Sequence, residues 1–196
     1  MSNLPPGFVI WITGLPASGK SSLAQAIHDL LAEEKILSVI LDANDLRALL
    51  TPEPEYSDAE RRWFYHVLTE LAVRFARQGV NVIIAATGNR RLYREQARCQ
   101  SPVFAEVYLD CPLLVCQSRD PKGQYLTEAG ADRTPGIGVA YEASFAPEVV
   151  VNTAVKTPVE AAYAVIDVLK LEHVIRGDSS HGDSQSFTHR EFTSPL

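Results

Sequence analysis

The feature that most restricts the fold of this chain is a glycine-rich segment near the N-terminus, Gly14-Leu15-Pro16-Ala17-Ser18-Gly19-Lys20-Ser21. The segment fits the pattern G-x-x-x-x-G-K-[ST] at every position. An apolar, β-rich run at 8–13 precedes it, and a stretch with helical apolar spacing at 21–35 follows it. A strand that leads through such a loop into a helix presents backbone N–H groups and a helix N-terminus to an anion. The segment therefore predicts a phosphate-binding loop (P-loop) between a strand and a helix.

Apolar runs and amphipathic stretches alternate along the rest of the chain. Further strands are expected at 37–42, 80–87, 103–110 and 148–153. Helices are expected at 58–78, in NRRLYREQARCQ, from PLLVCQSRD onward and at 158–175. Ser57 and Glu60 have the spacing of a capping box at the start of the long helix, and Gly79 is a suitable residue to end it. Five apolar strands separated by helices predict an α/β fold of the P-loop NTPase type, with a mainly parallel five-stranded sheet and helices on both faces.

Composition narrows the cellular setting. The chain has 196 residues, of which 46% are apolar, and a formal charge of −6. We therefore expect one globular domain at 1–176 and a flexible polar tail at 177–196. The negative charge also argues against a nucleic-acid or membrane partner, although it is compatible with a local basic pocket. The three cysteines, Cys99, Cys111 and Cys116, have no metal-binding spacing and are expected to be free buried thiols. Without a leader or a 20-residue apolar run, a cytoplasmic protein is expected, with a homodimer left open.

The phosphate loop predicts ATP and Mg²⁺ as cofactors. Lys20 would place a full charge near the β- and γ-phosphates, and the Ser21 hydroxyl could take a position on Mg²⁺, which prefers oxygen ligands. Three classes stay open at this point: a small-molecule kinase, a nucleotide-driven switch or motor, and a binding module without catalysis. The chain lacks a guanine-reading N-K-x-D segment, which disfavours a switch. A compact domain favours a kinase.

Residues 41–47, LDANDLR, follow the second expected strand. In a doubly wound sheet, ligands bind beyond the carboxyl ends of the strands, so Asp42, Asp45 and Arg47 should face the phosphate loop. A phosphoryl acceptor needs its hydroxyl oriented and its proton accepted, and the transferring group needs its charge neutralised. One carboxylate and one arginine suit these two tasks. The alternative is that Asp42 only caps the next helix or pairs with Arg47.

The ordered set of segments resembles the adenylylsulfate kinase family. These segments are WITGLPASGKSS, LDANDLR, YSDAERR, YLDCPLLVCQSRDPKGQY, PGI and YEA, and they run from Val9 to Leu169. RDPKGQY is the segment most specific to the family, because the phosphate loop alone occurs in many proteins. The resemblance implies transfer of the ATP γ-phosphate to the 3′-hydroxyl of adenylylsulfate, which gives phosphoadenylylsulfate in sulfate assimilation.

The resemblance also implies a role for individual positions. ATP and magnesium would be held by Gly14, Leu15, Pro16, Ala17, Ser18, Gly19, Lys20, Ser21, Ser22 and Arg119, with Ser21 on the metal. The catalytic residues would be Asp42, Asp45 as a second choice, and Lys20. The acceptor would be held by Asp42, Arg47, Tyr56, Arg61, Arg91, Lys122 and Ile137. Arg119, Asp120, Pro121, Lys122 and Gly123 would belong to a mobile lid that excludes water from the site.

Several positions depart from the family pattern, and they cluster on the acceptor side. Asn44 replaces the second aspartate, Phe64 replaces an asparagine, Gly88-Asn89-Arg90 replaces Ser-Pro-Tyr, and Thr134 replaces a phenylalanine that would stack on adenine. An amide cannot accept a proton as a carboxylate does. A second interpretation is therefore a kinase of the same scaffold that acts on another nucleotide-like or phosphorylated hydroxyl acceptor. A third is a non-catalytic nucleotide-binding module.

Two further groups of side chains have uncertain roles. Arg90, Arg91 and Arg94 form a basic edge that suits an anionic acceptor, although Arg90 and Arg94 could equally lie on a solvated helix face. Trp63, Phe64 and Tyr65 form an aromatic cluster. Burial explains part of this cluster, and one of the three rings could line the acceptor pocket.

Overall fold

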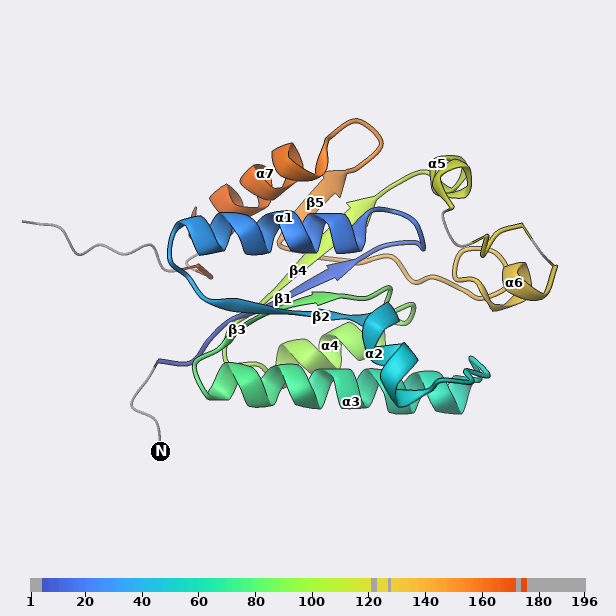
Figure 1. Ribbon diagram of the computed structural model, residues 1–196, viewed down its shortest axis with the longest axis horizontal. Helices are drawn as coiled ribbons and strands as arrows, with labels where there is room; N and C mark the ends of the chain where they lie inside the picture. The colour runs from blue at the N-terminus through green and yellow to red at the C-terminus, as the bar shows by residue number, and fades with distance from the viewer. Residues whose placement is uncertain (1–4, 121–122, 127, 172–173, 176–196) are drawn as a thin grey trace, which may run out of the picture.

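The fold is an open α/β sheet whose strands all run in parallel. The computed structural model describes residues 5–120, 123–126, 128–171 and 174–175 (Figure 1). The elements in chain order are β1 (Val9–Thr13), α1 (Lys20–Glu33), β2 (Ser38–Asp42), α2 (Ala43–Leu50), α3 (Asp58–Arg77), β3 (Asn81–Ala85), α4 (Arg91–Gln100), β4 (Phe104–Asp110), α5 (Leu113–Arg119), α6 (Glu128–Arg133), β5 (Val149–Asn152) and α7 (Pro158–Leu171). The strand order is β2-β3-β1-β4-β5. The predicted five-stranded parallel sheet is confirmed.

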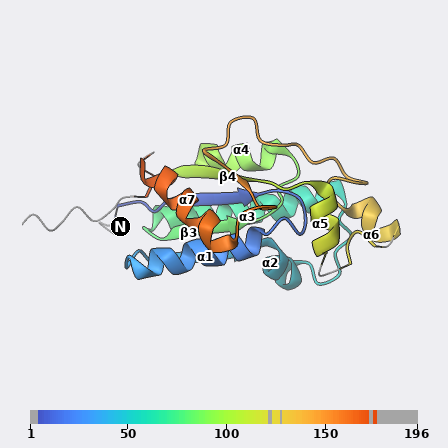
Figure 2. The same cartoon turned by 90° about the horizontal axis from the view of Figure 1, so that it is seen from above.

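Each face of the sheet carries its own layer of helices. Helices α1 and α7 cover one face, and α3 and α4 cover the other (Figure 1). The short helices α2, α5 and α6 gather at the end toward which the strands point (Figures 1 and 2). In a doubly wound sheet this end forms the ligand-binding crevice.

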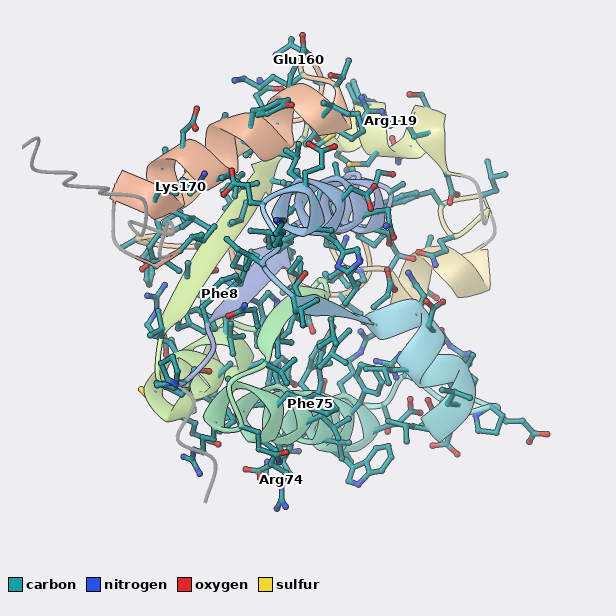
Figure 3. The ribbon with its side chains drawn as sticks, turned by 60° about the vertical axis from the view of Figure 1, so that its left-hand side comes forward. Phe8, Arg74, Phe75, Arg119, Glu160 and Lys170 are labelled. Carbon is teal, nitrogen blue, oxygen red and sulfur yellow. The ribbon has the colours of Figure 1, made fainter. Side chains whose placement is uncertain are left out.

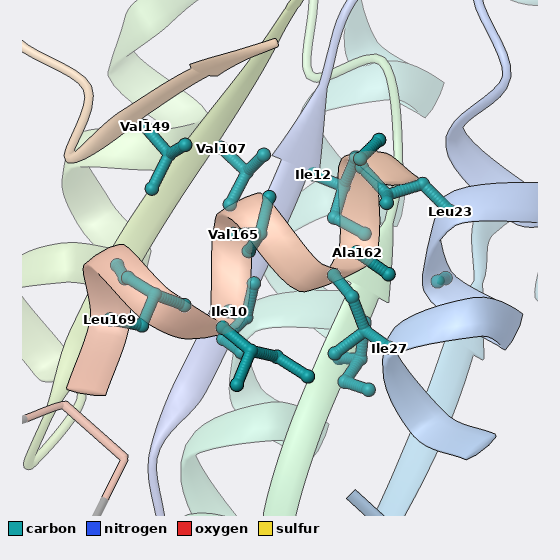
Figure 4. Close-up of a cluster of buried hydrophobic side chains, with 14 of the residues drawn as sticks. Ile10, Ile12, Leu23, Ile27, Val107, Val149, Ala162, Val165 and Leu169 are labelled. Carbon is teal, nitrogen blue, oxygen red and sulfur yellow. The ribbon is translucent and has the colours of Figure 1, made fainter. Parts of the chain in front are cut away.

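Strand β1 divides its side chains between two hydrophobic cores. Ile10 and Ile12 pack with α1 and α7, and this core is drawn in Figure 4 together with Leu23, Ile27, Val107, Val149, Ala162, Val165 and Leu169. Val9 and Trp11 pack on the opposite face against α3 and α4. Successive side chains of a strand point to opposite faces, so a strand covered on both sides must be apolar throughout. This requirement explains the uninterrupted apolar run that the sequence shows at 8–13.

The long helix α3 begins and ends close to the predicted positions. The Ser57 hydroxyl accepts a hydrogen bond from the backbone N–H of Glu60 at 3.2 Å, and Gly79 follows the helix with φ 89°. The expected capping box is only half formed, because the Glu60 carboxylate accepts from the N–H groups of Glu55 and Tyr56. No bounds were predicted for α2, although Asp42 was considered as the cap of such a helix, and α6 was not predicted. They have eight and six residues, too few for a periodic pattern to be recognised.

The prediction that Arg94 lies on a solvated helix face or on the acceptor side is wrong. Its side chain is 1% exposed, and Nε donates to Oε1 of Glu106 at 2.7 Å. The other two guanidinium nitrogens, Nη1 and Nη2, donate to the carbonyl oxygens of Gly88 and Glu142. Arg90 instead forms an exposed ion pair with Asp58 at 2.6 Å. The buried arginine therefore ties α4 to β4 and to the segment that follows the lid.

The cysteines match the expectation from the sequence only in part. Cys111 and Cys116 are free and buried, whereas Cys99 is exposed, so the expectation of burial fails for Cys99. Burial raises the pKa of the Cys116 thiol to about 12, which keeps it protonated and unreactive.

Across the described parts of the chain, every helix is too short or too polar to cross a membrane. The predicted tail at 177–196 lies outside the described residues.

Replacing Arg94 tests how much the buried ion pair between Arg94 and Glu106 contributes to the free energy of unfolding. We expect Arg94→Ala to lower the free energy of unfolding by roughly 3 kcal/mol, because the buried Glu106 loses its 2.7 Å partner and keeps only Arg98 at 3.6 Å and the Ser144 hydroxyl. The matched control Arg90→Ala removes an exposed pair and should cost only about 0–1 kcal/mol. Urea denaturation with comparison of midpoints and slopes measures both. Equal losses in the two variants would contradict the structural role of Arg94.

Candidate active site

The phosphate loop joins β1 to α1 and is closely packed at its first glycine. A Cβ atom at Gly14 would lie 2.8 Å from the Ser18 hydroxyl and 3.0 Å from Leu109, so only glycine fits there. The Ser18 hydroxyl is itself buried and has no hydrogen-bond partner among the described residues. Buried polar groups normally have partners. The loop is therefore built around a polar group that the chain does not itself supply.

Lys20 lies within this loop as a partly buried cation. Its ammonium group donates to the carbonyl oxygens of Gly14 at 3.1 Å and Leu15 at 2.7 Å. No described carboxylate lies within ion-pair distance of it. Burial lowers the pKa of Lys20 to about 8, and the nearby Asp42 carboxylate and Cys116 thiol oppose this only in part. An incoming phosphate would give the ammonium the anionic partner that it lacks.

A cavity of about 740 Å³ opens beside the loop at the carboxyl ends of the strands. Its described lining comes from the phosphate loop, α2, α3, the end of β3, the described residues of 119–137, here called the lid region, and the β5–α7 connection. The predicted residues that line it are Pro16, Ala17, Ser18, Gly19, Lys20, Ser21, Ser22, Arg47, Tyr56, Arg61 and Arg119. The predicted residues absent from its lining are Gly14, Leu15, Asp42, Asp45, Arg91 and Ile137. Lys122 lies outside the described residues.

The charge of the cavity is opposite to that of the whole chain. Its described lining contains six cationic side chains: Lys20, Arg47, Arg61, Arg119, Arg133 and Lys156. It contains one carboxylate, Asp120, in a chain of net charge −6. A concave site lined by one sign of charge attracts small ions of the opposite sign. The local basic pocket, which the overall composition did not exclude, is therefore present, and it suits an anionic substrate.

Asp42 links the second strand to the phosphate loop. Its Oδ1 accepts from the backbone N–H of Asn44 at 2.7 Å and so caps α2, and its Oδ2 accepts from the Ser21 hydroxyl at 2.5 Å. Asp42 therefore caps α2, as the alternative expected, but it does not only cap the helix, because the same carboxylate also contacts the loop. Asp45 is exposed in the first turn of α2. Asn44, by contrast, lines the cavity with an amide.

Arg47 has its guanidinium group between two aromatic rings. Its Cζ lies 4.0 Å from the ring centre of Phe64 and 5.0 Å from that of Tyr56. Its Nη1 donates to Oε1 of Glu60 at 2.7 Å. Phe64, a departure from the family pattern, thus supports an arginine that the pattern retains. In the aromatic cluster, Tyr65 lines the cavity, whereas Trp63 is exposed.

Arg61 joins the acceptor side to the lid. It is 4% exposed, and its Nε donates to the carbonyl oxygen of Tyr56 at 3.0 Å. Its Nη2 donates to the carbonyl oxygen of Arg133, at the end of α6, at 2.8 Å. A buried arginine that lines the cavity and contacts both segments fixes their separation.

Arg91 and Ile137 are not brought into the cavity. The Arg91 guanidinium lies 3.7 Å from the ring centre of Phe145 and donates to the carbonyl oxygen of Ala143 at 3.0 Å. Ile137 is partly exposed on the lid segment. Sequence reasoning missed Arg133 and Lys156, which do line the cavity. Neither belongs to a recognisable motif, and only the folding of the lid and the β5–α7 loop toward β1 could have identified them.

The lid region contacts the phosphate loop directly. The Tyr125 hydroxyl donates to the carbonyl oxygen of Pro16 at 3.0 Å. Gly136 has φ 96°, a conformation that favours glycine, and its Cα faces the Leu15 side chain, whose Cδ2 would lie 2.6 Å from an added Cβ atom. The lid region therefore packs on the two loop positions that precede Ala17.

The base of the lid is tied to the same loop from the other side. Arg119 donates through Nη2 to the carbonyl oxygen of Thr153 at 2.7 Å, and the Thr153 hydroxyl donates to the carbonyl oxygen of Ser18 at 2.8 Å. Figure 3 shows Arg119 at the same end of the molecule as Glu160, which marks the first turn of α7. The loop is thus held by β5 as well as by the lid.

Comparison with known proteins agrees with this geometry. Residues 6–152 match the protein family described as adenylylsulphate kinase. The chain belongs to this family. It is 36% identical to the adenylyl-sulfate kinase of Geotalea daltonii, with 87% of this chain and 86% of that protein covered. It is 34% identical to the adenylyl-sulfate kinase of Saccharomyces cerevisiae, with 87% of each chain covered.

Solved structures extend the comparison to three dimensions. The APS kinase of Mycobacterium tuberculosis in complex with AMPPNP and APS has a TM-score of 0.78 and 32% identity, with 85% of this chain and 99% of that chain covered. A shikimate kinase from Aquifex aeolicus, at 16% identity and a TM-score of 0.56, shares the fold alone; 85% of this chain and 98% of that chain are covered. The adenylylsulfate kinase family therefore provides the relevant comparison for the cavity.

Proposed function

We propose that this chain transfers the γ-phosphate of ATP to the 3′-hydroxyl of adenylylsulfate and so makes phosphoadenylylsulfate. Membership of the adenylylsulfate kinase family and the APS complex of a 32% identical relative support this activity. One observation of this chain carries the proposal. The phosphate loop and the two arginines Arg47 and Arg61 line the same continuous cavity. A donor phosphate and an anionic acceptor can therefore meet inside one site.

The donor end of the proposed site is formed by the phosphate loop. The N–H groups of the loop and the N-terminus of α1 surround the β- and γ-phosphates, and the Lys20 ammonium turns from the loop carbonyls toward them. Arg119 adds a second positive charge from α5. The Ser21 and Asp42 oxygens are hard ligands that fit Mg²⁺, directly or through water. When bound, this ion neutralises charge on the phosphate oxygens.

The acceptor end is formed by α2, α3 and the lid. Arg47 and Arg61 are placed to bind the anionic phosphosulfate group, and Tyr56 offers an aromatic surface to the base. Asp42 orients the acceptor hydroxyl and accepts its proton, because its carboxylate contacts the phosphate loop through Ser21, whereas Asn44 has no basic oxygen and Asp45 is exposed in the first turn of α2. Arg133 and Lys156 also line the cavity and contribute positive charge that attracts the two anionic substrates.

A panel of acceptors tests the proposed function. Purified protein with magnesium and ATP is incubated with adenylylsulfate, other nucleotides or sugar phosphates, and ADP release is measured. We expect turnover that depends on adenylylsulfate and exceeds the rate with any other member. Turnover with a different acceptor alone would replace adenylylsulfate as the substrate. ATP binding without acceptor-stimulated turnover would favour a non-catalytic module.

Asp42 and Asp45 can be separated by matched amide substitutions. Asp42→Asn should lower turnover by ~10²-fold or more and leave ATP affinity nearly unchanged, because asparagine still caps α2 but cannot accept a proton. Asp45→Asn should retain turnover within about twofold, because this carboxylate is exposed away from the cavity. Steady-state kinetics with both substrates varied measure the two variants. Loss of turnover in Asp45→Asn alone would move the catalytic role to Asp45.

The lowered pKa of Lys20 predicts a pH dependence for ATP binding. Lys20 is cationic below its pKa of about 8 and neutral above it, so its attraction for phosphate is lost as pH rises through this value. Between pH 7.5 and 9 we expect ATP affinity to fall roughly tenfold, measured by calorimetry. Lys20→Arg keeps its charge throughout this range, so its affinity should not fall over the same interval. Constant wild-type affinity up to pH 9.5 would contradict the assignment.

A further inference from the structure

Glu60 makes more contacts at the acceptor end than its place in a helix cap requires. It lies in the first turn of α3, and its backbone N–H already donates to the Ser57 hydroxyl. Its carboxylate reaches three other groups in two directions. Oε1 accepts from Arg47 Nη1 at 2.7 Å, while Oε2 accepts from the N–H of Glu55 at 2.6 Å and from the N–H of Tyr56 at 3.0 Å. One side chain thus connects α2, the 55–56 loop and α3.

The contact with Arg47 fixes a cavity-lining cation. The two side chains are 11% and 15% exposed, so this ion pair is largely shielded from water. The rings of Phe64 and Tyr56 restrict the guanidinium group further, at 4.0 and 5.0 Å from their centres. A guanidinium group held by one carboxylate and two rings keeps its remaining N–H groups in a fixed direction. Those groups belong to a residue that lines the cavity.

The contacts with the 55–56 loop fix an aromatic side chain. Tyr56 has φ 57°, a left-handed conformation that is uncommon for any residue other than glycine. The Glu60 carboxylate holds its N–H, and Arg61 Nε holds its carbonyl oxygen at 3.0 Å. The hydrogen-bond partners of the Tyr56 N–H and of its carbonyl oxygen are therefore consecutive residues of α3. The backbone conformation in turn decides where the Tyr56 ring lies relative to the cavity.

We propose that Glu60 is the positioning residue of the acceptor site, a role that rests on the proposed function. Glu60 does not line the cavity and acts on the acceptor only through Arg47 and Tyr56. Its two oxygens divide this task, since Oε1 orients the cation and Oε2 orients the backbone that carries the ring. The donor end has no contact with Glu60 among the described residues. Its removal should therefore weaken acceptor binding selectively.

The test compares three variants of one helix by steady-state kinetics with magnesium, ATP and adenylylsulfate. In Glu60→Ala, the KM for adenylylsulfate should rise by about 10- to 100-fold, because Arg47 loses its carboxylate and Tyr56 loses the acceptor of its N–H. The KM for ATP should stay within about twofold. Glu60→Gln should be intermediate, because an amide oxygen can still accept from a backbone N–H but carries no charge for Arg47.

Glu70→Gln supplies the matched control. Glu70 forms an exposed ion pair with Arg74 on the same helix, at 3.6 Å and remote from the cavity lining. Both KM values of this variant should equal those of the wild type. Calorimetric ATP binding and thermal unfolding show whether each variant is folded, and Glu60→Gln keeps the test usable if Glu60→Ala is unstable.

The outcomes separate the two proposals. An unchanged KM for adenylylsulfate in Glu60→Ala, with an active wild type, would overturn the role of Glu60 and leave the proposed function intact. Equal increases in both KM values, with a matching loss of thermal stability in both Glu60 variants, would also overturn it, because Glu60 would then serve only the fold. A wild type without adenylylsulfate-dependent turnover would contradict the proposed function itself.

Discussion

The active-site geometry depends on one ammonium group held within the phosphate loop. The side chain of Lys20 is partly buried, and its ammonium group donates to the carbonyl oxygens of Gly14 and Leu15, with no described carboxylate within ion-pair distance. A charge that is partly withdrawn from water without an anionic partner costs free energy, and the lowered pKa of Lys20 expresses this cost. The loop keeps its shape because β1 and α1 are embedded in the core, while Tyr125 and Thr153 hold its outer carbonyl groups. The fold thus maintains a cation whose natural partner is a phosphate.

The same logic extends over the cavity. Among the described residues, six cationic side chains and one carboxylate line the cavity, although the chain as a whole is acidic. An acidic outer surface repels extended polyanions, whereas a cationic hollow attracts a small anion that can enter it. Two consecutive anionic substrates, a triphosphate and a phosphosulfate, fit this distribution. The arginines are also fixed before binding, because Arg47 and Arg61 are already bonded to Glu60 and to backbone carbonyl groups. Less conformational freedom is then lost when the acceptor binds.

The sequence predicted the parts of the molecule that follow local rules. The strand at Val9–Thr13 was recognisable because burial on both faces demands continuous apolar residues, and the phosphate loop because its backbone demands glycine. Arg94 was misjudged because its partners Glu106 and Glu142 lie far away in sequence. Arg133 and Lys156 were missed for a related reason, since they reach the cavity only through tertiary packing. Arg47 was identified from its place after the second strand and Arg61 by resemblance to the family, and the structure adds how each is held.

The departures from the family pattern make physical sense together in this cavity. Asn44 lines it where the family pattern has an aspartate, so one negative charge is removed from a space that must hold two anions. Attraction for both substrates is then stronger, but the proton acceptor must come from elsewhere. Asp42 is the carboxylate in contact with the phosphate loop, because it begins α2 and its second oxygen reaches Ser21. Arg47 lies in the helix that Asp42 caps and is stacked on Phe64, another departure. Strand β2 and helix α2 therefore place a carboxylate and a cation one turn apart, the carboxylate on the phosphate loop and the cation in the cavity lining.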